Sequence, residues 1–348
     1  MTCLHIFNPE HDIALACNLS NFTAPHAGRQ LRADLGFLSA LWAEKGDYVL
    51  VEDVDQAARA YRRAMRTKDC PVNWITKQQL RTVRWRRVDP WGWDAALRHQ
   101  LHRAGVKKEG LPSEDYVMMI RRLSHRITSA QLLRQLQGDG LVGEAVLCES
   151  ENDIRRWAGK HPRMVLKAPW SSSGRGIRFI DGEMTDYHWG WIRNLLKTQG
   201  GVMAEPYYEK VKDFGMEFEA TTEGIRFLGL SLFHTTNGAY TGNILATETV
   251  KRQMMSRYGI LDLMDAVQER ICGLLNLEDY IGPFGVDMMI VKSPNGFLLH
   301  PCVEINLRRT MGHVALALSP QDDHVQKVMR ISYESHYKLS IRKLHYLK

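Results

Sequence analysis

The stretches Gly285-Val286-Asp287 and Val303-Glu304-Ile305-Asn306-Leu307-Arg308, separated by one hairpin, decide the fold of this chain. Apolar residues 288–291 continue the first stretch, Ser293-Pro294-Asn295-Gly296 is a strong turn signal, and residues 297–299 begin a return strand. The chain is therefore expected to fold back on itself as an antiparallel pair.

Three side chains with oxygen atoms are expected to meet on this hairpin. Side chains alternate between the two faces of a strand, so Glu304 and Asn306 point the same way, and an antiparallel return can bring Asp287 beside them. Mg²⁺ prefers hard oxygen ligands, commonly one or two carboxylates with water and substrate phosphates. The pattern favours a magnesium site. The competing interpretation is a hairpin that carries solvated charges at its end.

A second motif lies earlier in the chain. Residues 164–167 form a short apolar strand that ends in Lys167, a segment rich in small residues follows from 168 to 176, and strand character resumes at 177–180. Small residues let backbone N–H groups approach phosphate oxygens, and a lysine supplies a point charge. The segment matches neither a Walker loop nor a dinucleotide fingerprint. An ordinary surface turn is the alternative.

Taken in this order, the motifs resemble those of the ATP-grasp superfamily. That family combines a strand lysine, a glycine-rich flap, a hinge glutamate at a strand end, and a distal Asp followed by Glu-x-Asn. The resemblance covers roughly residues 123 to 318. It implies an α/β and α+β fold, with an N-terminal parallel α/β domain of the pre-ATP-grasp type over residues 1–122. A central subdomain with the flap (123–205) and a C-terminal subdomain with the metal site and a terminal helix (206–348) would follow.

The resemblance also implies roles for individual residues. Lys167 is expected at the nucleotide phosphates, Glu205 with the backbone after it at the adenine, and Asp213 at the ribose. The implied nucleotide-binding residues are Lys167, Ser172, Ser173, Gly174, Arg175, Gly176, Glu205, Pro206, Tyr207 and Asp213. The implied metal ligands are Asp287, Glu304 and Asn306.

Two arginines complete the implied catalytic set with Lys167. Arg126 stands where many members have a second phosphate-binding lysine, so it keeps the charge with a different contact geometry. Arg308 extends the metal motif to Glu-x-Asn-x-Arg, as in members resembling carbamoyl phosphate synthetase and biotin carboxylase, where the arginine holds a carboxy phosphate.

The activity implied by the resemblance is that of an ADP-forming ligase. A carboxylate would attack the γ-phosphate of ATP, and an amine or similar nucleophile would displace phosphate from the resulting acyl phosphate. ATP with Mg²⁺, or Mn²⁺ in its place, is the expected cofactor set, and the partners would be small-molecule or peptide substrates. Two alternatives stay open: a small-molecule kinase on the same fold, and a protein that binds nucleotide or nucleic acid without turnover.

Composition is that of an ordinary enzyme. The chain has 348 residues, 44% of them hydrophobic, and no apolar run approaches the roughly 20 residues of a membrane span. Its start lacks the basic and apolar regions of a signal peptide. Six scattered cysteines without a C-x-x-C pair favour neither a zinc site nor a disulfide framework. A cytoplasmic protein is expected, and a homodimer is compatible with this composition.

The net charge of +7 comes largely from one segment, Arg81 to Lys108, in which basic residues surround Trp85, Trp91 and Trp93. Such a pattern can bind nucleic acid through phosphates and stacking. No nucleic-acid-binding motif accompanies it, so a helical surface around buried tryptophans is favoured.

The N-terminal region has the pattern of a βαβ unit. Its parts are a strand at 4–7, a helix at 30–45 and a strand at 48–51. Asn8 to Asp12 follow the first strand, where open α/β sheets present ligand-binding loops. Glu10 and His11 are therefore candidates for substrate contact, and a helix cap explains them as well.

Three further segments are expected from the pattern. Helices are predicted at 129–137 and 262–276 from their apolar faces. The polar segment His234 to Asn243 follows a strand and suits either an acceptor loop or a surface turn.

Overall fold

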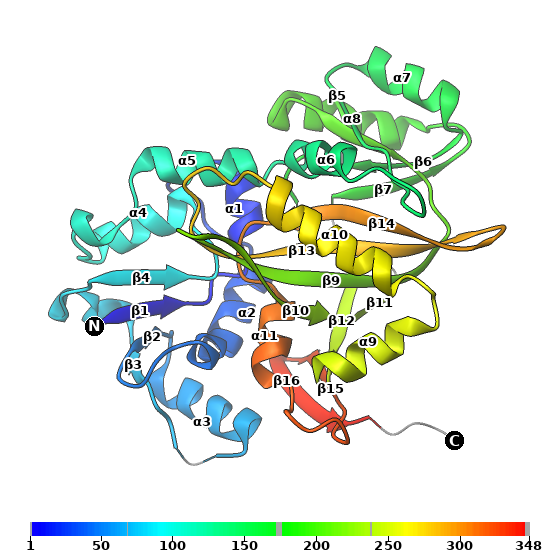
Figure 1. Ribbon diagram of the computed structural model, residues 1–348. Coiled ribbons are helices and arrows are strands. Elements are labelled where there is room, and N and C mark those ends of the chain that lie inside the picture. Colours follow the sequence, from blue (N-terminus) through cyan, green and yellow to red (C-terminus); the bar gives the residue numbers. More distant parts are fainter. Residues whose placement is uncertain (1, 68, 172–175, 237–238, 345–348) are drawn as a thin grey trace. The chain divides into compact units, whose positions relative to one another are not determined.

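The structure is a computed structural model that describes residues 2–67, 69–171, 176–236 and 239–344. Contacts between residues divide the chain into two units. Figure 1 labels the helices and strands of both units. The first unit comprises Met1–Arg122, Thr241–Thr247 and Leu307–Lys348, and the second comprises Leu123–Tyr240 and Glu248–Asn306. The three-part division by sequence range stays a prediction.

A four-stranded parallel sheet forms the centre of the first unit. Its order is β3-β2-β1-β4. The strands are β1 Cys3–Ile6, β2 Tyr48–Leu50, β3 Asn73–Ile75 and β4 Arg87–Pro90. Because β2 and β4 lie on opposite sides of β1, the strand order reverses between β1 and β4. In open α/β sheets the carboxyl ends of the strands at such a point are the usual place for a ligand.

Helices surround this sheet, and one of them is shorter than the sequence pattern predicts. The helices are α1 His11–Cys17, α2 His26–Leu35, α3 Val54–Met65, α4 Ala95–Arg103, α5 Glu114–Leu123 and α11 Met311–Leu318. The helix expected at 30–45 begins at His26 and ends at Leu35, and a 3₁₀ helix, Gly36–Leu41, continues from it. Gly36 has low helix propensity and lies against Val51, so the chain tightens there.

Within the described residues, strands and not a helix form the last elements of the chain. After α11 it forms the antiparallel strands β15 Lys327–Glu334 and β16 His336–Lys343, and the end of β12 (Ala239–Leu245) pairs with β15. Met329 of β15 and Leu245 of β12 lie in one hydrophobic core with Phe7 and Leu38. This shared core explains why the C-terminal residues belong to the first unit.

The basic segment is only partly helical. It contains the end of a 3₁₀ helix (Lys77–Thr82), strand β4 and helix α4. Trp85 and Trp91 are buried, and the Trp85 indole N–H donates to the Leu80 carbonyl at 2.9 Å. Both rings therefore serve the core, and neither presents a stacking surface.

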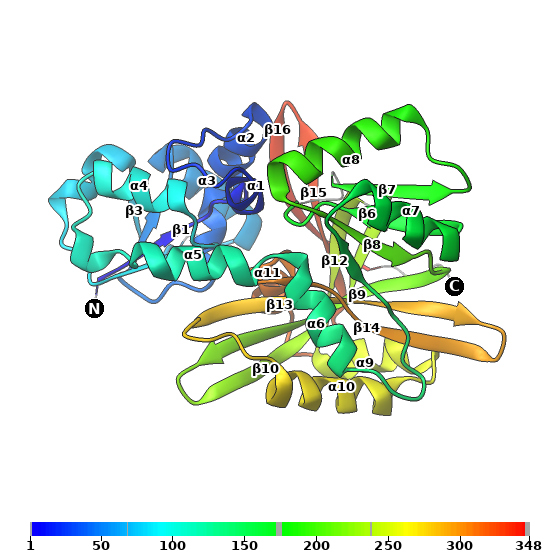
Figure 2. The ribbon, with the colours of Figure 1, turned by 90° about the horizontal axis from the view of Figure 1, so that it is seen from above.

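The second unit contains two antiparallel sheets. The larger has the order β10-β9-β13-β14. Its strands are β9 Lys210–Thr221, β10 Gly224–Ser231, β13 Gly282–Ser293 and β14 Gly296–Asn306, and a short strand, β11 Phe233–Thr236, follows β10. Helices α9 Glu248–Ser256 and α10 Leu261–Leu274 lie along one face of this sheet (Figure 2). The predicted hairpin of β13 and β14 is confirmed, with Ser293 paired to Gly296 across the turn.

The smaller sheet has the order β5-β8-β6-β7. Its strands are β5 Val146–Cys148, β6 Arg163–Lys167, β7 Ile177–Asp181 and β8 Val202–Pro206, and helices α7 Glu151–Lys160 and α8 Asp186–Gln199 share their core with it. Helix α6 Arg126–Gln135 packs against β14, an edge strand of the larger sheet, where Ser129 Oγ accepts from the Ile305 N–H at 2.9 Å. Such a contact satisfies a backbone group that an edge strand would otherwise expose.

The combination of one parallel and several antiparallel sheets confirms the predicted α/β and α+β fold class. Among the described residues, no helix is both long and apolar enough to cross a membrane.

Candidate active site

Three adjacent strands present polar side chains on one face of the larger sheet. In register, Glu217, Gly285 and Asn306 lie side by side on β9, β13 and β14, and two residues further along lie Gly215, Asp287 and Glu304. Positions two apart on a strand share a face. Three carboxylates and one amide therefore stand on the same face, and glycines occupy the two remaining positions.

The opposite face of these strands belongs to the hydrophobic core. Met216, Phe218, Phe284, Val286 and Ile305 alternate with the polar residues and are all buried. The rings of Phe218 and Phe284 stack at 5.2 Å between centroids. This apolar packing fixes the register and thereby the direction in which the carboxylates point.

Two of the carboxylates converge over Gly215. A Cβ atom added at Gly215 would lie 3.4 Å from Asp287 Oδ1 and 3.4 Å from Glu217 Oε1. Any larger residue would crowd the space between them. Glu217 is 2% exposed. It was not anticipated from the sequence, although a glutamate between Met216 and Phe218 in a buried strand is itself a signal, because an uncompensated buried charge is costly.

The three predicted metal ligands lie together. Asn306 Nδ2 donates to Asp287 Oδ2 at 3.0 Å, and Glu304 is paired directly opposite Asp287. Because the Asn306 amide nitrogen makes this hydrogen bond, the amide oxygen is left as the group that can accept a hydrogen bond or ligate a cation. Their role as metal ligands stays a prediction.

The donor set fits Mg²⁺ in number and type. Among the described residues, the three carboxylates do not form a set with oxygens all within 4.8 Å of one another. Mg²⁺ commonly takes only one or two protein carboxylates and completes its octahedron with water and phosphate oxygens. Asp287, the Asn306 amide and one neighbouring carboxylate would satisfy that requirement.

An irregularity in β14 sets Glu304 opposite Asp287. Residues 301–303 lie opposite the single residue Met288, so β14 bulges at this point. Pro301 has no N–H to donate to a ladder and is suited to such a bulge. The adjacent Cys302 is fully buried, and burial together with the nearby Asp287 and Glu205 carboxylates raises the pKa of its thiol.

Lys167 and Glu205 come from neighbouring strands of the smaller sheet. Val165 of β6 is paired with Glu205 of β8, so Lys167 lies two residues along on the same face. Lys167 Nζ lies 2.6 Å from Glu205 Oε2, and each side chain is 8% exposed. The residue expected at the phosphates and the one expected at the adenine therefore form one buried ion pair.

Arg126 links the smaller sheet to the carboxylate face. Its guanidinium donates to the Ala168 carbonyl at 2.5 Å, to Ser171 Oγ at 2.9 Å and to Glu304 Oε1 at 2.7 Å. The side chain is 6% exposed. Arg126 thus places positive charge between Ala168 and Ser171, which follow Lys167, and the Glu304 carboxylate.

Most of the predicted flap, Ser172, Ser173, Gly174 and Arg175, lies outside the described residues. Its last residue, Gly176, closes the base of the segment, because its carbonyl accepts from the Ala168 N–H at 2.8 Å. A Cβ atom added there would lie 2.3 Å from the side chain of Ser171. Only glycine fits this position.

The remaining predicted nucleotide contacts lie after β8. Pro206 is paired with Met164, and the Tyr207 N–H donates to the Arg163 carbonyl at 3.0 Å. Asp213 accepts from Lys210 Nζ at 2.5 Å and from Thr235 Oγ1 at 2.9 Å. Thr235 belongs to the polar segment 234–243, so that segment contributes to the surroundings of Asp213.

Comparison with solved structures finds similar folds at low sequence identity. The ADP complex of N5-carboxyaminoimidazole synthetase from Staphylococcus aureus gives a TM-score of 0.54 at 15% identity, covering 95% of this chain and 82% of that one. The biotin carboxylase domain of the 2-oxoglutarate carboxylase from Hydrogenobacter thermophilus, in complex with ADP, gives 0.53 at 12% identity, covering 95% and 74%. Both are ATP-grasp proteins.

This chain has the ATP-grasp fold. No protein-family model and no curated protein matches its sequence. The resemblance inferred from the ordered motifs is therefore confirmed at the level of the fold.

Arg308 belongs to the first unit of this ATP-grasp fold, although it lies two residues after Asn306. Arg308 Nε and Nη2 donate to the two oxygens of Asp12 at 2.8 and 2.7 Å, and Nη1 donates to the Arg309 carbonyl at 3.0 Å. The bidentate pair fixes the plane of the guanidinium.

Two further residues near Lys167 were missed by sequence reasoning. His300 is 1% exposed, and neither ring nitrogen has a hydrogen-bond partner among the described residues. Burial and the nearby Lys167 charge lower its pKa to about 3, so the imidazole is neutral. Its ring meets Tyr208 edge to face at 5.6 Å, and burial raises the pKa of Tyr208 to about 12.

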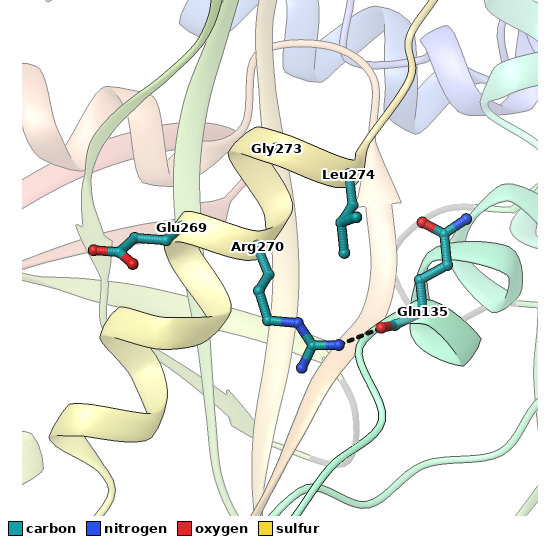
Figure 3. Close-up of a pocket in the computed structure, with 5 residues that line it drawn as sticks. All are labelled: Gln135, Glu269, Arg270, Gly273 and Leu274. Carbon is teal, nitrogen blue, oxygen red and sulfur yellow. Dashed lines mark hydrogen bonds between the residues drawn. The ribbon is translucent and has the colours of Figure 1, made fainter.

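A depression between α6 and α10 lies apart from these residues (Figure 3). Arg270 spans it and donates to the Gln135 carbonyl and, at 3.3 Å, to that of Leu136, while Glu269 points away from both. Arg270 thereby caps the C-terminal carbonyls of α6. Arg270 therefore has a structural role in this depression, which is to satisfy the carbonyl groups at the end of α6.

A compact polar cluster also lies in the first unit. Cys3, His5 and Asp47 are the described His, Cys, Asp and Glu residues whose ligand atoms all lie within 4.8 Å. His5 Nε2 is 3.0 Å from Asp47 and Nδ1 is 3.1 Å from Asp89, which Arg309 also contacts at 2.7 Å. Two carboxylates, one guanidinium and one imidazolium sum to zero charge, so the cluster balances without a metal ion.

Proposed function

We propose that this protein is an ATP-dependent ligase that activates a carboxylate as an acyl phosphate, forms ADP, and joins the acyl group to an amine or similar nucleophile. The observation that carries the proposal is the polar face built by Glu217, Asp287, Glu304 and Asn306 together with Arg126, which contacts Glu304. Carboxylates for a metal ion beside buried cations are what phosphoryl transfer requires.

Each side chain has a defined task in this proposal. Lys167, oriented by Glu205, and Arg126 would hold phosphate oxygens, and Asp287 with Asn306 and a neighbouring carboxylate would hold Mg²⁺. Mg²⁺, when bound, would neutralise charge on the phosphates. The ADP present in the two similar solved structures supports an adenine nucleotide as the ligand.

The chemistry needs no nucleophile from the protein. A carboxylate oxygen of the acid substrate attacks the γ-phosphorus of ATP, and ADP leaves. The amine then attacks the carbonyl carbon of the acyl phosphate, and phosphate leaves. Burial raises the pKa of Cys302, the cysteine near Lys167 and Glu205, so it stays a thiol and is unsuited to covalent catalysis.

The test is ADP release across a panel of amino acids and short peptides, with hydroxylamine added to trap acyl phosphate as a hydroxamate. ADP release stimulated by an acid, together with a hydroxamate, supports the ligase. A stable phosphorylated product without condensation would indicate a kinase. AMP with pyrophosphate, or ATP binding without any acid-stimulated ADP across the panel, would overturn the proposal.

The nucleotide site can be tested separately by calorimetry. Lys167→Met should weaken binding of ATP more than binding of adenosine, because the lysine charge acts on phosphates. Lys160→Met is the matched control, since Lys160 is exposed on α7. Equal losses for the two ligands would remove Lys167 from the phosphate site.

A further inference from the structure

Two segments of the first unit lie against each other over one face of the parallel sheet. Residues 77–87 contain the 3₁₀ helix and lead into β4, and residues 102–110 follow the end of α4. Gly105 has a φ of +98°, and a Cβ atom added there would lie 2.8 Å from Arg81 Cβ, so only glycine lets the two segments come so close. Beneath them lies one shared core, which includes Leu80, Trp85, Leu101 and Val106.

The outer side of these segments is crowded with positive charge. Together they carry eight exposed lysine and arginine side chains and one exposed carboxylate, that of Glu109. Arg87 lies 4.0 Å from Asp89, and across the described residues no ion pair involves any of the other seven cations. We call the eight side chains the basic surface; they are Lys77, Arg81, Arg84, Arg86, Arg87, Arg103, Lys107 and Lys108.

An uncompensated cluster of this size differs from ordinary surface charge. Where exposed arginines of this chain have an acidic neighbour they pair with it, as Arg193 does with Glu151 at 2.8 Å and Arg226 with Glu219 at 2.5 Å. Like charges gathered on one surface repel one another and disfavour the compact state. A ligand that carries many negative charges would remove this repulsion, so the basic surface is suited to a polyanion.

The rest of the surface chemistry favours one class of polyanion. Among the described residues, the large apolar side chains that are exposed all lie outside the range 77–110. Proteins that lie on membranes insert such side chains into the lipid, and protein interfaces rely on apolar or aromatic anchors. Trp85 is buried, so its ring cannot stack on an unpaired base. Contacts with a phosphate backbone need none of these groups, because arginine and lysine suffice.

We propose that the basic surface binds the phosphate backbone of a duplex or folded nucleic acid. The planar guanidinium groups can each hold two phosphate oxygens, and the lysines add point charges. Binding would be independent of base sequence, since phosphates carry no direct sequence information. All eight side chains belong to the first unit, and none has a part in the proposed ligase chemistry. The inference therefore adds a partner to that function and does not depend on it.

Helix α3 offers a matched control on the other side of the same sheet. Val49 of β2 lies in the core that contains α3, whereas its neighbour Leu50 packs against the core of Trp85. Consecutive residues of a strand point to opposite faces, so α3 and the basic surface cover opposite faces of the sheet. Arg59 and Arg63 are exposed on α3 and can be altered without touching the basic surface.

The experiment measures binding of the full-length protein to labelled duplexes by fluorescence anisotropy. The duplexes are an RNA and a DNA of about 20 base pairs with the same sequence, at salt concentrations between about 50 and 200 mM. If about five phosphates are contacted, the logarithm of the affinity for DNA should fall against the logarithm of the salt concentration with a slope of about −4.5. The affinity would then drop about 500-fold over this range.

Two double variants locate the binding surface. Arg84→Gln with Lys107→Gln removes two cations of the basic surface, so binding at low salt should weaken by at least about tenfold and the slope should become shallower by about two. Arg59→Gln with Arg63→Gln lowers the net charge equally and should leave the affinity and the slope nearly unchanged. All four side chains are exposed, so both variants should keep the Tm of the unaltered protein.

Three outcomes would overturn the inference. Equal losses in the two double variants would show that affinity follows overall charge and not the basic surface. Tighter binding of a single strand than of its duplex would point to base stacking. Binding to vesicles of anionic lipid without binding to either duplex would assign the surface to a membrane.

Binding of either duplex with the expected loss in Arg84→Gln/Lys107→Gln supports the inference, and the duplex that binds more tightly identifies the source of the phosphates. None of these measurements requires ATP. Failure of the ligase assay would therefore leave this result standing, and failure of nucleic-acid binding would leave the proposed function intact.

Discussion

Lys167 Nζ lies 2.6 Å from Glu205 Oε2 in an environment from which water is almost excluded. The two residues occupy adjacent antiparallel strands, so the backbone ladder itself holds their side chains in register. A buried pair of this kind contributes little net stability over an apolar pair, but removing one partner leaves an uncompensated charge. The arrangement holds the lysine side chain in one place without leaving its charge unbalanced.

Removing one partner of the Lys167–Glu205 pair should destabilise the folded protein more than replacing both partners with apolar residues. Lys167→Met and Glu205→Leu are each expected to lower the free energy of unfolding by about 3–5 kcal/mol, while the double variant should recover most of that loss. Urea denaturation measures all three. Lys210→Met is the control, because the exposed Lys210–Asp213 pair should contribute no more than about 1 kcal/mol. Single variants that cost no more than this control would show that the buried pair is not charged.

The metal-ligand prediction can be tested with one carboxylate on β13, Asp287, and one on β9, Glu217. Asp287→Asn and Glu217→Gln should each raise the Mg²⁺ concentration needed for half-maximal ATP turnover by about tenfold, since one lost charge-assisted contact is worth about 1.5–3 kcal/mol. Glu219→Gln is the matched control on β9, where Glu219 is paired with Arg226 at 2.5 Å. If Glu217→Gln behaves like the control at limiting Mg²⁺, Glu217 is not part of the metal site.

The local parts of this site could be predicted from sequence, and the non-local parts could not. The β13–β14 hairpin follows from period-two alternation and the Ser293–Gly296 turn, so the sequence alone places Asp287, Glu304 and Asn306 on one face. Glu217 could not be placed, because β9 pairs with β13 across a long intervening stretch of chain and no local pattern specifies that register.

Tertiary packing also decided features that sequence periodicity does not reveal. The helix expected at 30–45 changes to a 3₁₀ helix at Gly36, where the chain lies against Val51. The C-terminal strands belong to the first unit because Met329 shares a core with Phe7. Apolar patterns reveal that a residue is buried but not which other segment buries it.

His300 should destabilise the protein in acid. Burial and Lys167 lower its pKa from 6.5 to about 3, so the unfolded chain binds a proton between these values that the folded chain does not. Stability is therefore lost as pH falls from about 6.5 toward 3. Urea denaturation from pH 7 to 4 should show this loss, and His300→Leu should flatten the slope. An unchanged slope in His300→Leu would mean that other groups dominate the acid transition.

His5 should destabilise the protein in alkali. Burial opposes its charged form, but hydrogen bonds with Asp89, Cys3 and Asp47 outweigh burial and raise its pKa from 6.5 to about 10. The resulting stability is fully present below pH 6.5 and is lost as pH rises through about 10. The free energy of unfolding should fall by a few kcal/mol across this range, and His5→Gln should remove most of the pH dependence.

The same cluster allows a direct check for a metal ion. Cys3, His5 and Asp47 are close enough to ligate one, whereas the balanced charges predict none. Elemental analysis of the purified protein should find no stoichiometric zinc, and EDTA should leave the Tm unchanged. If the purified protein holds stoichiometric zinc and Cys3→Ala loses it, the cluster is a metal site. His5 would then be a neutral zinc ligand and not an imidazolium.

Arg308 should act on turnover and not on nucleotide affinity. Charge gathers on the transferring phosphoryl group only as the carboxylate attacks, so a guanidinium placed there acts mainly in the transition state. Arg308→Lys keeps the charge but loses the bidentate contact with Asp12 at 2.8 and 2.7 Å. Acid-stimulated ADP release should fall about 10- to 100-fold, with the Kd for ATP changed by no more than about twofold.

Asp12→Asn and Arg342→Lys complete this test. Asp12→Asn removes the carboxylate that orients Arg308 and should lower turnover in the same direction, and the two effects should not add because both break one contact. Arg342 is exposed on β16, so Arg342→Lys should change nothing. Equal losses of ATP affinity and turnover in Arg308→Lys would show that Arg308 grips the nucleotide. Wild-type turnover in Arg308→Lys would remove this arginine from the acyl-phosphate step.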